Sequence, residues 1–511
     1  MSVRIEGDVG NPAEVIGRVP RRLFGSFVEH LGRSVYTGIF EPGHSTSDGR
    51  GFRGDVLELV RELGPTVVRY PGGNFVSAYR WEDGVGPDRP VRLDPAWHSV
   101  ESNRFGLHEF AAWAEAAGAE VMYAVNLGTR GIQEAADVLE YCNHASGTDL
   151  SERRRANGAD RPFGFKVWCL GNEMDGPWQV GHKTADEYGR LAAETARVLR
   201  MIDPDVELVV AGSSNAEMPT FGEWERTVLR HTAGLVDHIS LHAYYQELHG
   251  DTDSYLASGA ALDRYIRAVA GIIDEQGLGG RVGISVDEWN VWDQRRWNET
   301  DQARLAEEGW REHPRIIEDT YTVTDAVVVG SLLGSLLRNV DRVTMANQAQ
   351  LVNVIAPIRT EPGGPAWRQP TFHPFRQVAA LASGVSLRLN VEGERLRTAQ
   401  HGEVDLVDVA ATAGDSGRGA VFLTNRSTAS PTEVRLRLRG ARYGVYAAET
   451  LAAPDGETRH AVNTADSQPV RPVPLPGTAV TSDPGGTTIT VTLPPLSWTV
   501  LQLCPEAGGH A

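Results

Sequence analysis

Short apolar runs alternate with longer amphipathic segments from about residue 20 to residue 384. The apolar runs are brief and rich in β-branched residues, which is typical of buried parallel strands. We expect eight of them to be strands, at 23–29, 66–70, 121–126, 165–170, 207–212, 238–242, 283–288 and 342–346. Eight strands, most of them followed by a candidate helix, are what a closed (β/α)8 barrel needs.

The segments between these runs have helical periodicity. In 184–202, Tyr188, Leu191 and Leu199 fall near one stripe, opposite Glu187. Similar segments are 106–117, 131–142, 221–232, 261–276 and 319–337. An open doubly wound sheet is the alternative, but it usually has a glycine-rich phosphate-binding turn after its first strand, and this sequence has none there. The sequence therefore predicts an α/β fold with a (β/α)8 TIM barrel.

Beyond about residue 385 the pattern changes to period two. Alternating segments are 432–438 and 487–493, and shorter apolar runs are 420–423 and 497–501. Glycine- and proline-rich turns separate them, as in a β-sandwich. We therefore expect a barrel domain over 18–384 and a C-terminal β-sandwich domain, jelly-roll-like, over 385–511.

Composition narrows the class of partner. The chain has 511 residues, 41% of them hydrophobic and 23% charged, which is an ordinary globular balance. Its formal net charge is −18, which argues against nucleic acid as a partner. No stretch approaches the roughly 20 apolar residues that span a bilayer, so no membrane partner is expected.

The cysteines and the N-terminus bear on localisation. Cys142, Cys169 and Cys504 are widely spaced, odd in number and form no Cys-x-x-Cys pair. Neither a disulfide framework nor a thiolate zinc site is supported, and we expect reduced thiols and a cytoplasmic protein. The first residues contain no apolar core of a secretory signal.

Polar side chains stand at the C-terminal end of nearly every predicted strand. In a barrel, these ends and the loops after them form the active site. The residues there include Glu29, His30, Arg69, Asn74, Asn126, Asn172, Glu173, Ser214, Asn215, His242, Tyr244, Glu288 and Gln350. Such a ring of hydrogen-bonding groups suits a polyhydroxylated ligand.

Two glutamates in this ring fit the chemistry of a glycosidase. Glu173 follows the fourth strand and Glu288 ends the seventh, so the two can face each other across the mouth of a small barrel. A retaining glycosidase needs two carboxyl groups about 5–5.5 Å apart, one as acid/base and one as nucleophile. The alternative is that both are solvated rim carboxylates. Each, however, comes directly after an apolar strand and stands beside Asn or Trp. We predict that Glu173 is the acid/base and Glu288 the nucleophile.

Five longer strings resemble those of glycoside hydrolase family 51, the α-L-arabinofuranosidases. They are 69–75, 124–131, 168–178, 287–292 and 350–358, in register from Phe24 to about Trp367. The resemblance implies a retaining, exo-acting enzyme that releases terminal arabinofuranose from arabinan, arabinoxylan or derived oligosaccharides. It implies no cofactor and no metal. It also implies that residues 1–17 join the sandwich, that 295–318 forms a loop over the site, and that the chain assembles as a homo-oligomer, a hexamer.

The resemblance also implies substrate-binding residues around the two glutamates. Glu29 and Gln350 are expected to bind sugar hydroxyls, Asn172 to hold the 2-hydroxyl, and Tyr244 to lie beside the nucleophile. Further expected members are Arg69, Asn74 and Trp292. Arg69 beside the nucleophile would favour its ionised form. Taken singly, Arg69 can equally be a structural ion pair and Tyr244 a core residue. Trp97, Trp178 and Trp292 are candidate sugar-stacking walls.

Other functions stay open at this point. A related galactofuranosidase or xylosidase activity would use much the same hydroxyl pattern. A metal-dependent barrel hydrolase is compatible with 15 histidines, but no His-x-His closes the first strand, where Glu29-His30 stands instead. A non-catalytic carbohydrate-binding protein would need the loss of one of the two glutamates.

Overall fold

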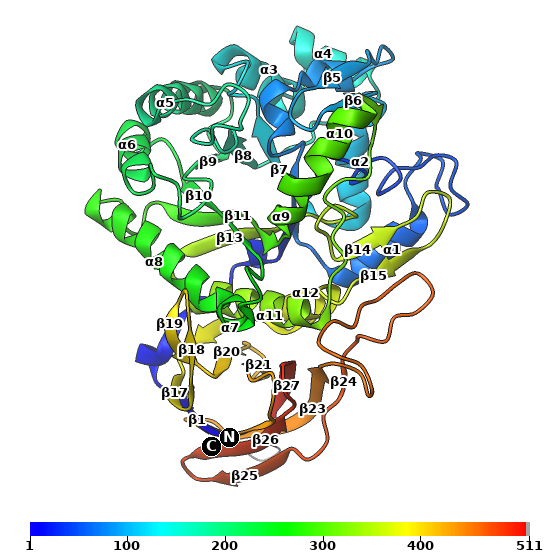
Figure 1. Cartoon of the computed structure of the whole chain (residues 1–511). Coiled ribbons are helices and arrows are strands. Elements are labelled where there is room, and N and C mark those ends of the chain that lie inside the picture. Colours follow the sequence, from blue (N-terminus) through cyan, green and yellow to red (C-terminus); the bar gives the residue numbers. More distant parts are fainter. Residues whose placement is uncertain (507–511) are drawn as a thin grey trace.

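The computed structural model describes residues 1–506 as a barrel domain above a β-sandwich (Figure 1). Parallel strands close the barrel in chain order: β3 (Gly25–Phe27), β4 (Val67–Tyr70), β7 (Glu120–Val125), β8 (Val167–Leu170), β9 (Glu207–Val210), β10 (His238–Tyr245), β11 (Gly283–Val291) and β13 (Val343–Ala349). All eight predicted strands are present, and the predicted (β/α)8 barrel is confirmed.

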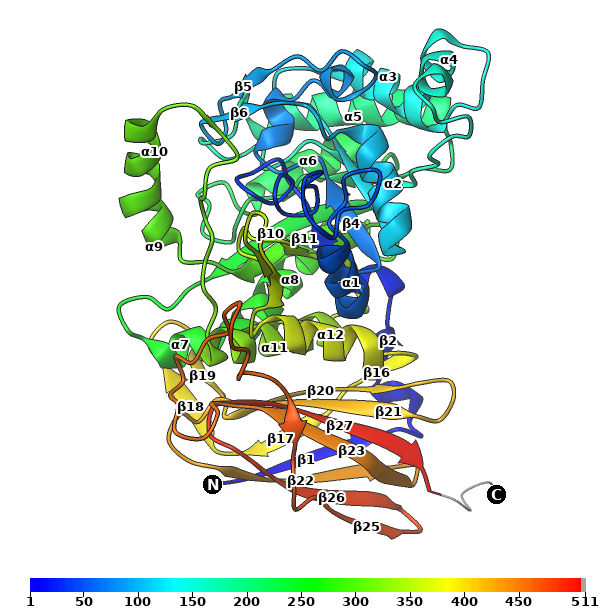
Figure 2. The ribbon, with the colours of Figure 1, turned by 90° about the vertical axis from the view of Figure 1, so that its right-hand side faces the viewer.

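Helices surround the barrel strands (Figures 1 and 2). Six were predicted, and the structure has them as α2 (Leu107–Ala117), α3 (Ile132–Asn143), α5 (Ala185–Ile202), α6 (Glu223–Thr232), α8 (Ser258–Glu275) and α11 (Val323–Arg338). Helices that the periodicity analysis missed are α1 (Gly54–Leu63), α4 (Asp149–Ala156), α7 (Thr252–Leu256) and α12 (Phe372–Leu381).

Helix α5 shows how local sequence fixes such an element. Thr184 Oγ1 accepts the backbone N–H of Glu187, and the Glu187 carboxylate accepts the backbone N–H of Thr184, which together form a capping box. The apolar stripe then buries Tyr188, Ala192 and Leu199 against the barrel.

The strand residues alternate between two environments. One set, exemplified by Val68, Trp168 and Leu208, packs in the large core with the helices. The other set fills the interior of the barrel and comprises Val67, Met122, Ala124, Val167, Cys169, Val209 and Met345, joined there by Val76 from the loop after β4. This apolar interior lies beneath the polar strand ends.

The second domain consists of two packed sheets. One has the order β17 (Asn390–Gly393), β1 (Ser2–Asp8), β22 (Thr432–Arg439), β26 (Gly486–Leu493), β25 (Ala479–Asp483). The other has the order β2 (Val15–Arg18), β16 (Val385–Leu387), β20 (Val407–Ala413), β21 (Gly419–Asn425), β27 (Ser497–Pro505), β23 (Tyr443–Leu451), β24 (Val473–Pro474). The four predicted sandwich strands lie within β21, β22, β26 and β27.

The N-terminal segment belongs to this sandwich. Strand β1 pairs in parallel with β22, and β2 pairs antiparallel with β16. Val3 and Ile5 of β1 are buried in the sandwich core with Val434 and Leu436. We therefore propose domains of 18–384 and 385–511, the latter joined by 1–17; residues 507–511 lie outside the described part.

Polar and apolar contacts join the two domains. The Arg426 guanidinium donates to the backbone O of Leu256 at 2.9 Å and to Ser331 Oγ at 3.1 Å. A Cβ added at Gly330 would come within 2.3 Å of the Trp498 ring, so only glycine lets α11 approach β27 this closely. A hairpin of β18 (Arg395–Thr398) and β19 (Gly402–Asp405) extends from the sandwich toward α7.

Two predictions about the chain as a whole can be compared with the structure. All three cysteines are free thiols, as expected. Among residues 1–506, none of the helices combines the length and the apolar character needed to cross a membrane.

Candidate active site

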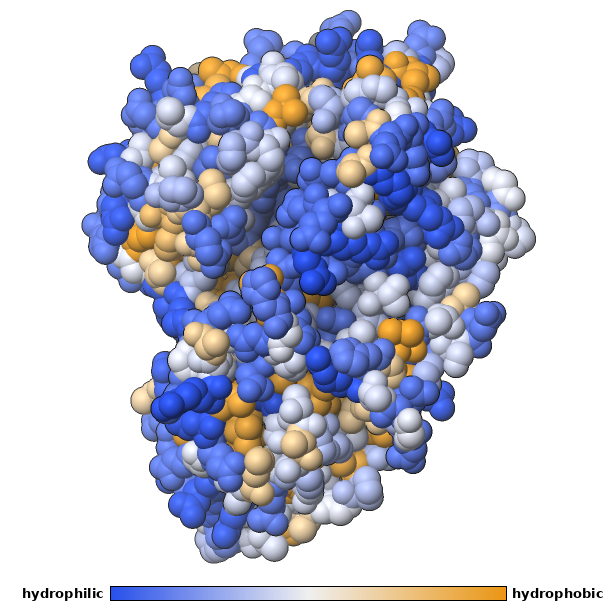
Figure 3. All heavy atoms as spheres, in the orientation of Figure 1, coloured by the Kyte–Doolittle hydropathy of each residue, from blue (hydrophilic) through white to orange (hydrophobic). Residues whose placement is uncertain are grey.

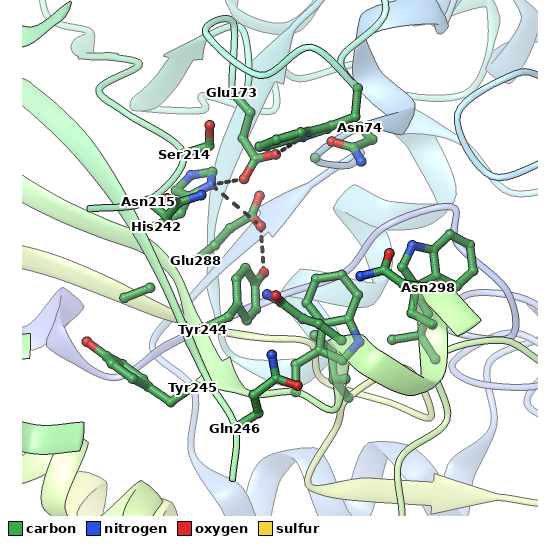
Figure 4. A pocket seen from close by; sticks show the side chains of 18 of the residues that line it. Asn74, Glu173, Ser214, Asn215, His242, Tyr244, Tyr245, Gln246, Glu288 and Asn298 are labelled. Atoms are coloured by element: carbon green, nitrogen blue, oxygen red, sulfur yellow. Dashed lines mark hydrogen bonds and ion pairs between the residues drawn. The ribbon is translucent and has the colours of Figure 1, made fainter. Parts of the chain in front are cut away.

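The two predicted catalytic glutamates meet at the C-terminal end of the barrel. Glu173 follows β8 in a turn where its own φ is 44°, a left-handed conformation that is uncommon outside glycine and concentrates at functional sites. Glu288 lies within β11. Single oxygens of these two residues and a ring nitrogen of His242 all lie within 4.8 Å of one another (Figure 4). This spacing matches the roughly 5–5.5 Å of retaining glycosidases rather than the roughly 6.5–9.5 Å of inverting ones.

Two donors hold the carboxylate of Glu288. Arg69 Nη1 donates to Oε1 at 2.6 Å, and the Tyr244 hydroxyl donates to Oε2 at 2.6 Å. Burial acts against the charge of Arg69, but the neighbouring negative groups, Asp287 foremost, outweigh it and raise its pKa. The two donors fix the orientation of the Glu288 carboxylate from two sides.

Asn172 is placed to receive a ligand. Its Oδ1 accepts a hydrogen bond from Arg69 Nη2 at 2.7 Å, which fixes the amide orientation. Its Nδ2 is buried and has no hydrogen-bond partner among the described residues. A buried amide donor without a partner is costly unless a ligand satisfies it. A substrate hydroxyl is a suitable acceptor.

Glu29 is buried against the same site. Its Oε1 accepts from Trp97 Nε1 and from the backbone N–H of Phe75, both at 2.9 Å, and its Oε2 accepts from Gln350 Nε2 at 3.0 Å. Burial, followed by the negative charge of Glu288, raises the pKa of Glu29 to about 7. This carboxyl is therefore balanced between its neutral and charged forms near neutral pH.

His242 links the acidic groups of the site. Its Nδ1 lies 2.8 Å from Glu173 Oε1, and its Nε2 lies 3.3 Å from Asp287 Oδ1. Burial by itself lowers the pKa of an imidazole. Here the charge of Glu288 and the hydrogen bonds with Asp287 and Glu173 outweigh burial, and the pKa of His242 is raised well above its ordinary value. This direction favours the protonated ring, whose Nδ1 faces Glu173 and whose Nε2 faces Asp287.

The site opens into one large cavity. Its volume is about 970 Å³, and seven predicted site residues line it: Glu29, Asn74, Glu173, Tyr244, Glu288, Trp292 and Gln350. Arg69 and Asn172 lie beneath them through the hydrogen bonds described above. In the space-filling view, the barrel half is hollowed near its centre (Figure 3).

The three candidate stacking tryptophans also line this cavity. Trp97 donates to Glu29, and Trp178 Nε1 donates to Glu173 Oε2 at 2.7 Å. Trp292 packs edge-on against Tyr244, with ring centroids 5.3 Å apart. Each indole therefore contacts a predicted site residue directly.

Several lining residues were not predicted as part of the site. His242 stood among the polar strand ends, and its period-two spacing from Tyr244 on one strand was a signal that places both on one face. The segment 295–318 folds as α9 (Gln294–Arg296), a π-helical turn (Trp297–Asp301), α10 (Gln302–Glu308) and β12 (Arg311–Glu312). Trp297, Gln302 and Leu305 of this segment line the cavity.

Only one group of possible metal ligands occurs among residues 1–506, formed by Glu173, His242 and Glu288. The two carboxylates already accept hydrogen bonds from Arg69, Tyr244 and Trp178. The arrangement fits proton transfer and attack on an electrophilic carbon better than metal ligation.

Comparison with known proteins agrees with this geometry. Residues 59–259 match the family model described as Alpha-L-arabinofuranosidase 1 domain, and 287–497 match Alpha-L-arabinofuranosidase C-terminal domain. An intracellular exo-α-(1→5)-L-arabinofuranosidase of Streptomyces lividans is 53% identical, over 98% of this chain and 75% of the relative. An exo-α-(1→6)-L-arabinofuranosidase of Bifidobacterium longum is also 53% identical, over 97% of this chain and 96% of the relative.

Solved structures agree as well. A family 51 α-L-arabinofuranosidase from Bifidobacterium longum superposes with a TM-score of 0.91 at 42% identity, covering 98% of this chain and 99% of that one. An α-L-arabinofuranosidase from Thermotoga maritima, solved with arabinose, has a TM-score of 0.84 at 32% identity, with 98% and 99% covered. The chain belongs to glycoside hydrolase family 51 and is an α-L-arabinofuranosidase.

Proposed function

We propose that this enzyme removes terminal α-L-arabinofuranosyl groups from arabinan-derived oligosaccharides by a retaining double displacement. The observation that carries the mechanism is the approach of Glu173 and Glu288 to within 4.8 Å, with Glu288 held by Arg69 and Tyr244. The relatives named for α-(1→5) and α-(1→6) linkages support arabinan as the source of the substrate.

In the first step, a Glu288 oxygen attacks the anomeric carbon while the bond to the leaving oxygen breaks. Glu173 gives its proton to that oxygen, and the sugar is left covalently bound to Glu288. In the second step, Glu173 takes a proton from water, the water oxygen bonds to the anomeric carbon, and the bond to Glu288 breaks. Two inversions leave the α configuration unchanged.

The rest of the inner site binds the sugar. Asn172 Nδ2, which lacks a partner among the described residues, holds the 2-hydroxyl. Glu29 and Gln350 bind further hydroxyls, Asn74 and Trp292 complete the cavity wall, and Arg69 and Tyr244 orient the nucleophile.

The stereochemistry of the first product tests the mechanism. Proton NMR at early times should show the α-anomer of arabinose before mutarotation, and the β-anomer would overturn the retaining assignment. A panel of aryl glycosides tests selectivity: arabinofuranoside should exceed galactofuranoside and xylopyranoside in kcat/KM. A preference for either competitor would assign the related furanosidase or xylosidase activity instead.

We further propose, from the family resemblance, that the chain assembles as a homo-oligomer, a hexamer. We also propose that it acts inside the cell, because several relatives are named as intracellular enzymes. Light scattering should give a mass several times the 55.5 kDa of one chain. A mass equal to one chain at micromolar concentration would overturn the assembly.

A further inference from the structure

The cavity extends well beyond the two glutamates, on the side of β9 and β10. Its lining there includes residues of the loop after β9, the end of β10, helices α7 and α8, and the tip of the β18–β19 hairpin. These are Ser214, Asn215, Ala216, Glu217, Tyr245, Gln246, Leu248, Ser254, Tyr255, Ser258, Ala261, Tyr265, Gln400 and His401. We call this region the distal arm. A single pentose at the glutamates would leave it empty.

The distal arm starts on the side of the acid/base. Ser214 and Asn215 lie next to Glu173 and His242, whereas Asn298 lies on the opposite side of the cavity (Figure 4). Because Glu173 protonates the departing oxygen, the leaving part of the substrate must lie on its side. The end of the arm at Ser214 and Asn215 is thus positioned for sugars beyond the cleaved bond, and the arm continues from there past Tyr244 to Tyr245 and Gln246 (Figure 4).

The alternation of side chains along β10 directs one of them into the distal arm. Successive residues of a strand point to opposite sides. Tyr244 of β10 points at Glu288, and the next residue, Tyr245, points away from both glutamates (Figure 4). Gln246 and Leu248 follow it, and Leu248 is 37% exposed. The arm therefore offers an aromatic ring, an aliphatic surface and an amide.

The sandwich domain supplies the outer end of the arm. The backbone N–H of Gln400 donates to Ser254 Oγ at 3.1 Å, which fixes the hairpin tip on α7. The neighbouring His401 has its backbone N–H bound to Thr398 Oγ1 at 2.9 Å. Burial lowers the pKa of His401, so its imidazole is neutral near pH 7 and can donate and accept hydrogen bonds.

The charged groups in and around the distal arm restrict which class of sugar can bind there. Among the residues described, neither lysine nor arginine lines the cavity, and the arm carries the exposed carboxylate of Glu217. The lining therefore offers an acidic sugar no direct cationic partner; Arg264 stands behind Tyr245 and His401 without lining the cavity. Aromatic rings, amides and a neutral imidazole suit the apolar faces and hydroxyls of neutral sugars.

We propose that the distal arm binds neutral pentose units that lie two or more residues from the cleaved bond, on the leaving side, and that the β18–β19 hairpin completes this site. The inference rests on the proposed function. It gives the sandwich domain a direct part in substrate recognition, through Gln400 and His401.

The test is a double variant, Gln400→Ala with His401→Ala, compared with wild type on aryl arabinofuranoside, arabinobiose and arabinotetraose. The aryl and biose substrates end before the arm, so their kcat/KM should not change. For arabinotetraose, kcat/KM should fall on the order of tenfold, the loss expected of one or two hydrogen bonds. The matched control is Arg397→Ala with Glu403→Ala, whose side chains are 86% and 54% exposed on the same hairpin and lie outside the cavity.

Two results would overturn the inference. One is an unchanged ratio of tetraose to biose kcat/KM in the double variant, and the other is an equal loss on all three substrates. If the hairpin unfolds, Tyr245→Phe tests the same arm from the barrel side and should lower the same ratio a few-fold. If wild type hydrolyses none of the arabinosides, the proposed function fails; if it hydrolyses them without the predicted ratio change, only the distal arm fails.

Discussion

The inner and outer parts of the cavity are built in different ways. Inner residues such as Glu29, Arg69 and Glu288 lie on or directly after barrel strands, are buried, and bind one another by hydrogen bonds. Outer residues such as Trp178 and Gln400 lie on loops and hairpins, and Trp178 is 49% exposed. Strands fix positions through their ladders and packing, whereas loops change with little cost to the fold. We infer that chemistry belongs to the inner part and chain-length preference to the outer part.

The two parts also differ in charge. The inner part holds four carboxyl groups, on Glu29, Glu173, Asp287 and Glu288, against one arginine and one histidine, Arg69 and His242. Buried carboxyl groups this close together oppose each other's ionisation. Such a cluster lowers the stability of the folded protein, and it is retained because catalysis needs it. The distal arm carries little charge. Substitutions in the inner part should therefore change rate and stability together, and those in the outer part should change rate slightly.

The largest effect should come from the nucleophile. Glu288→Ala should lower kcat on the order of 10⁶-fold, the size seen when a covalent nucleophile is removed. Azide should restore part of the rate on an activated aryl substrate and yield the glycosyl azide of inverted configuration. The control is Glu223→Ala, a glutamate that is 74% exposed on α6 and should leave the rate unchanged. Turnover of Glu288→Ala near the wild-type rate would contradict the assignment.

The acid/base should show a smaller and substrate-dependent effect. Glu173→Ala removes the proton donor, which matters for poor leaving groups and hardly for dinitrophenolate. Alkyl arabinofuranosides should lose on the order of 10²–10⁴-fold in kcat/KM, and the dinitrophenyl arabinofuranoside much less. With the latter, a burst followed by slow turnover should appear, because the glycosyl-enzyme forms readily but lacks its base. Equal losses for both substrates would mean that Glu173 is not the general acid.

Substitution of Glu29 should change both the catalytic rate and the stability of the folded enzyme. Its pKa is raised from 4.5 to about 7, so the folded state holds a proton that the unfolded state has released, and wild-type stability falls as pH rises through this window. Glu29→Gln should therefore be more stable than wild type above pH 7, by up to about 3 kcal/mol, with no difference below pH 4. Its kcat/KM should drop about 10–100-fold through lost sugar contacts. Urea unfolding at both pH values measures the difference, and a constant difference would contradict the shift.

Much of the inner part could be predicted because its signals are local. Each barrel strand is a short β-branched run, and the polar residue that ends it stands at the active face whatever the loops do. His242 could have been added by its spacing from Tyr244. The raised pKa of Glu29 could not, because it depends on the burial of the carboxyl in the folded barrel and on the charge of Glu288, which lies on a strand remote in sequence.

The outer part could not be predicted because its contacts are remote in sequence. Gln400 contacts Ser254, 146 positions away, and nothing in the local pattern of either segment indicates this. In α10 a single residue, Leu305, is buried, so the segment lacks the apolar stripe that reveals a helix. Helix α1, which was not predicted, is different: its five buried apolar residues have helical spacing, so its sequence does carry the signal of an amphipathic helix.

Substitutions of Trp178 test whether this residue belongs functionally to the inner or to the outer part of the cavity. Its indole N–H donates to Glu173 Oε2 at 2.7 Å, but the ring is largely exposed on a loop. Trp178→Phe keeps an aromatic surface and removes one hydrogen bond, worth about 1 kcal/mol, so kcat/KM should fall a few-fold and stability should not change. Trp178→Ala, measured alongside, separates stacking from hydrogen bonding. A loss as large as that of Glu173→Ala would place Trp178 functionally in the inner part.

The smallest effect should come from removing metal ions. Glu173, His242 and Glu288 are close enough to bind one metal ion together. If no metal is bound, another interaction must hold these side chains close to one another. His242 supplies one: its Nδ1 lies 2.8 Å from Glu173 Oε1 and 3.7 Å from Glu288 Oε2, and a positive charge on the ring offsets part of the repulsion between the two carboxylates.

A metal would have to displace a proton from that ring and compete with Arg69 and Tyr244 for Glu288. Exhaustive dialysis against EDTA should therefore leave kcat/KM for the aryl arabinofuranoside unchanged across the pH range of activity. Adding zinc or manganese to the dialysed enzyme should give no increase. If activity is lost and one of these ions restores it, His242 is a neutral ligand, the compactness of the inner part is due to a metal, and the metal-dependent hydrolase is the correct mechanism.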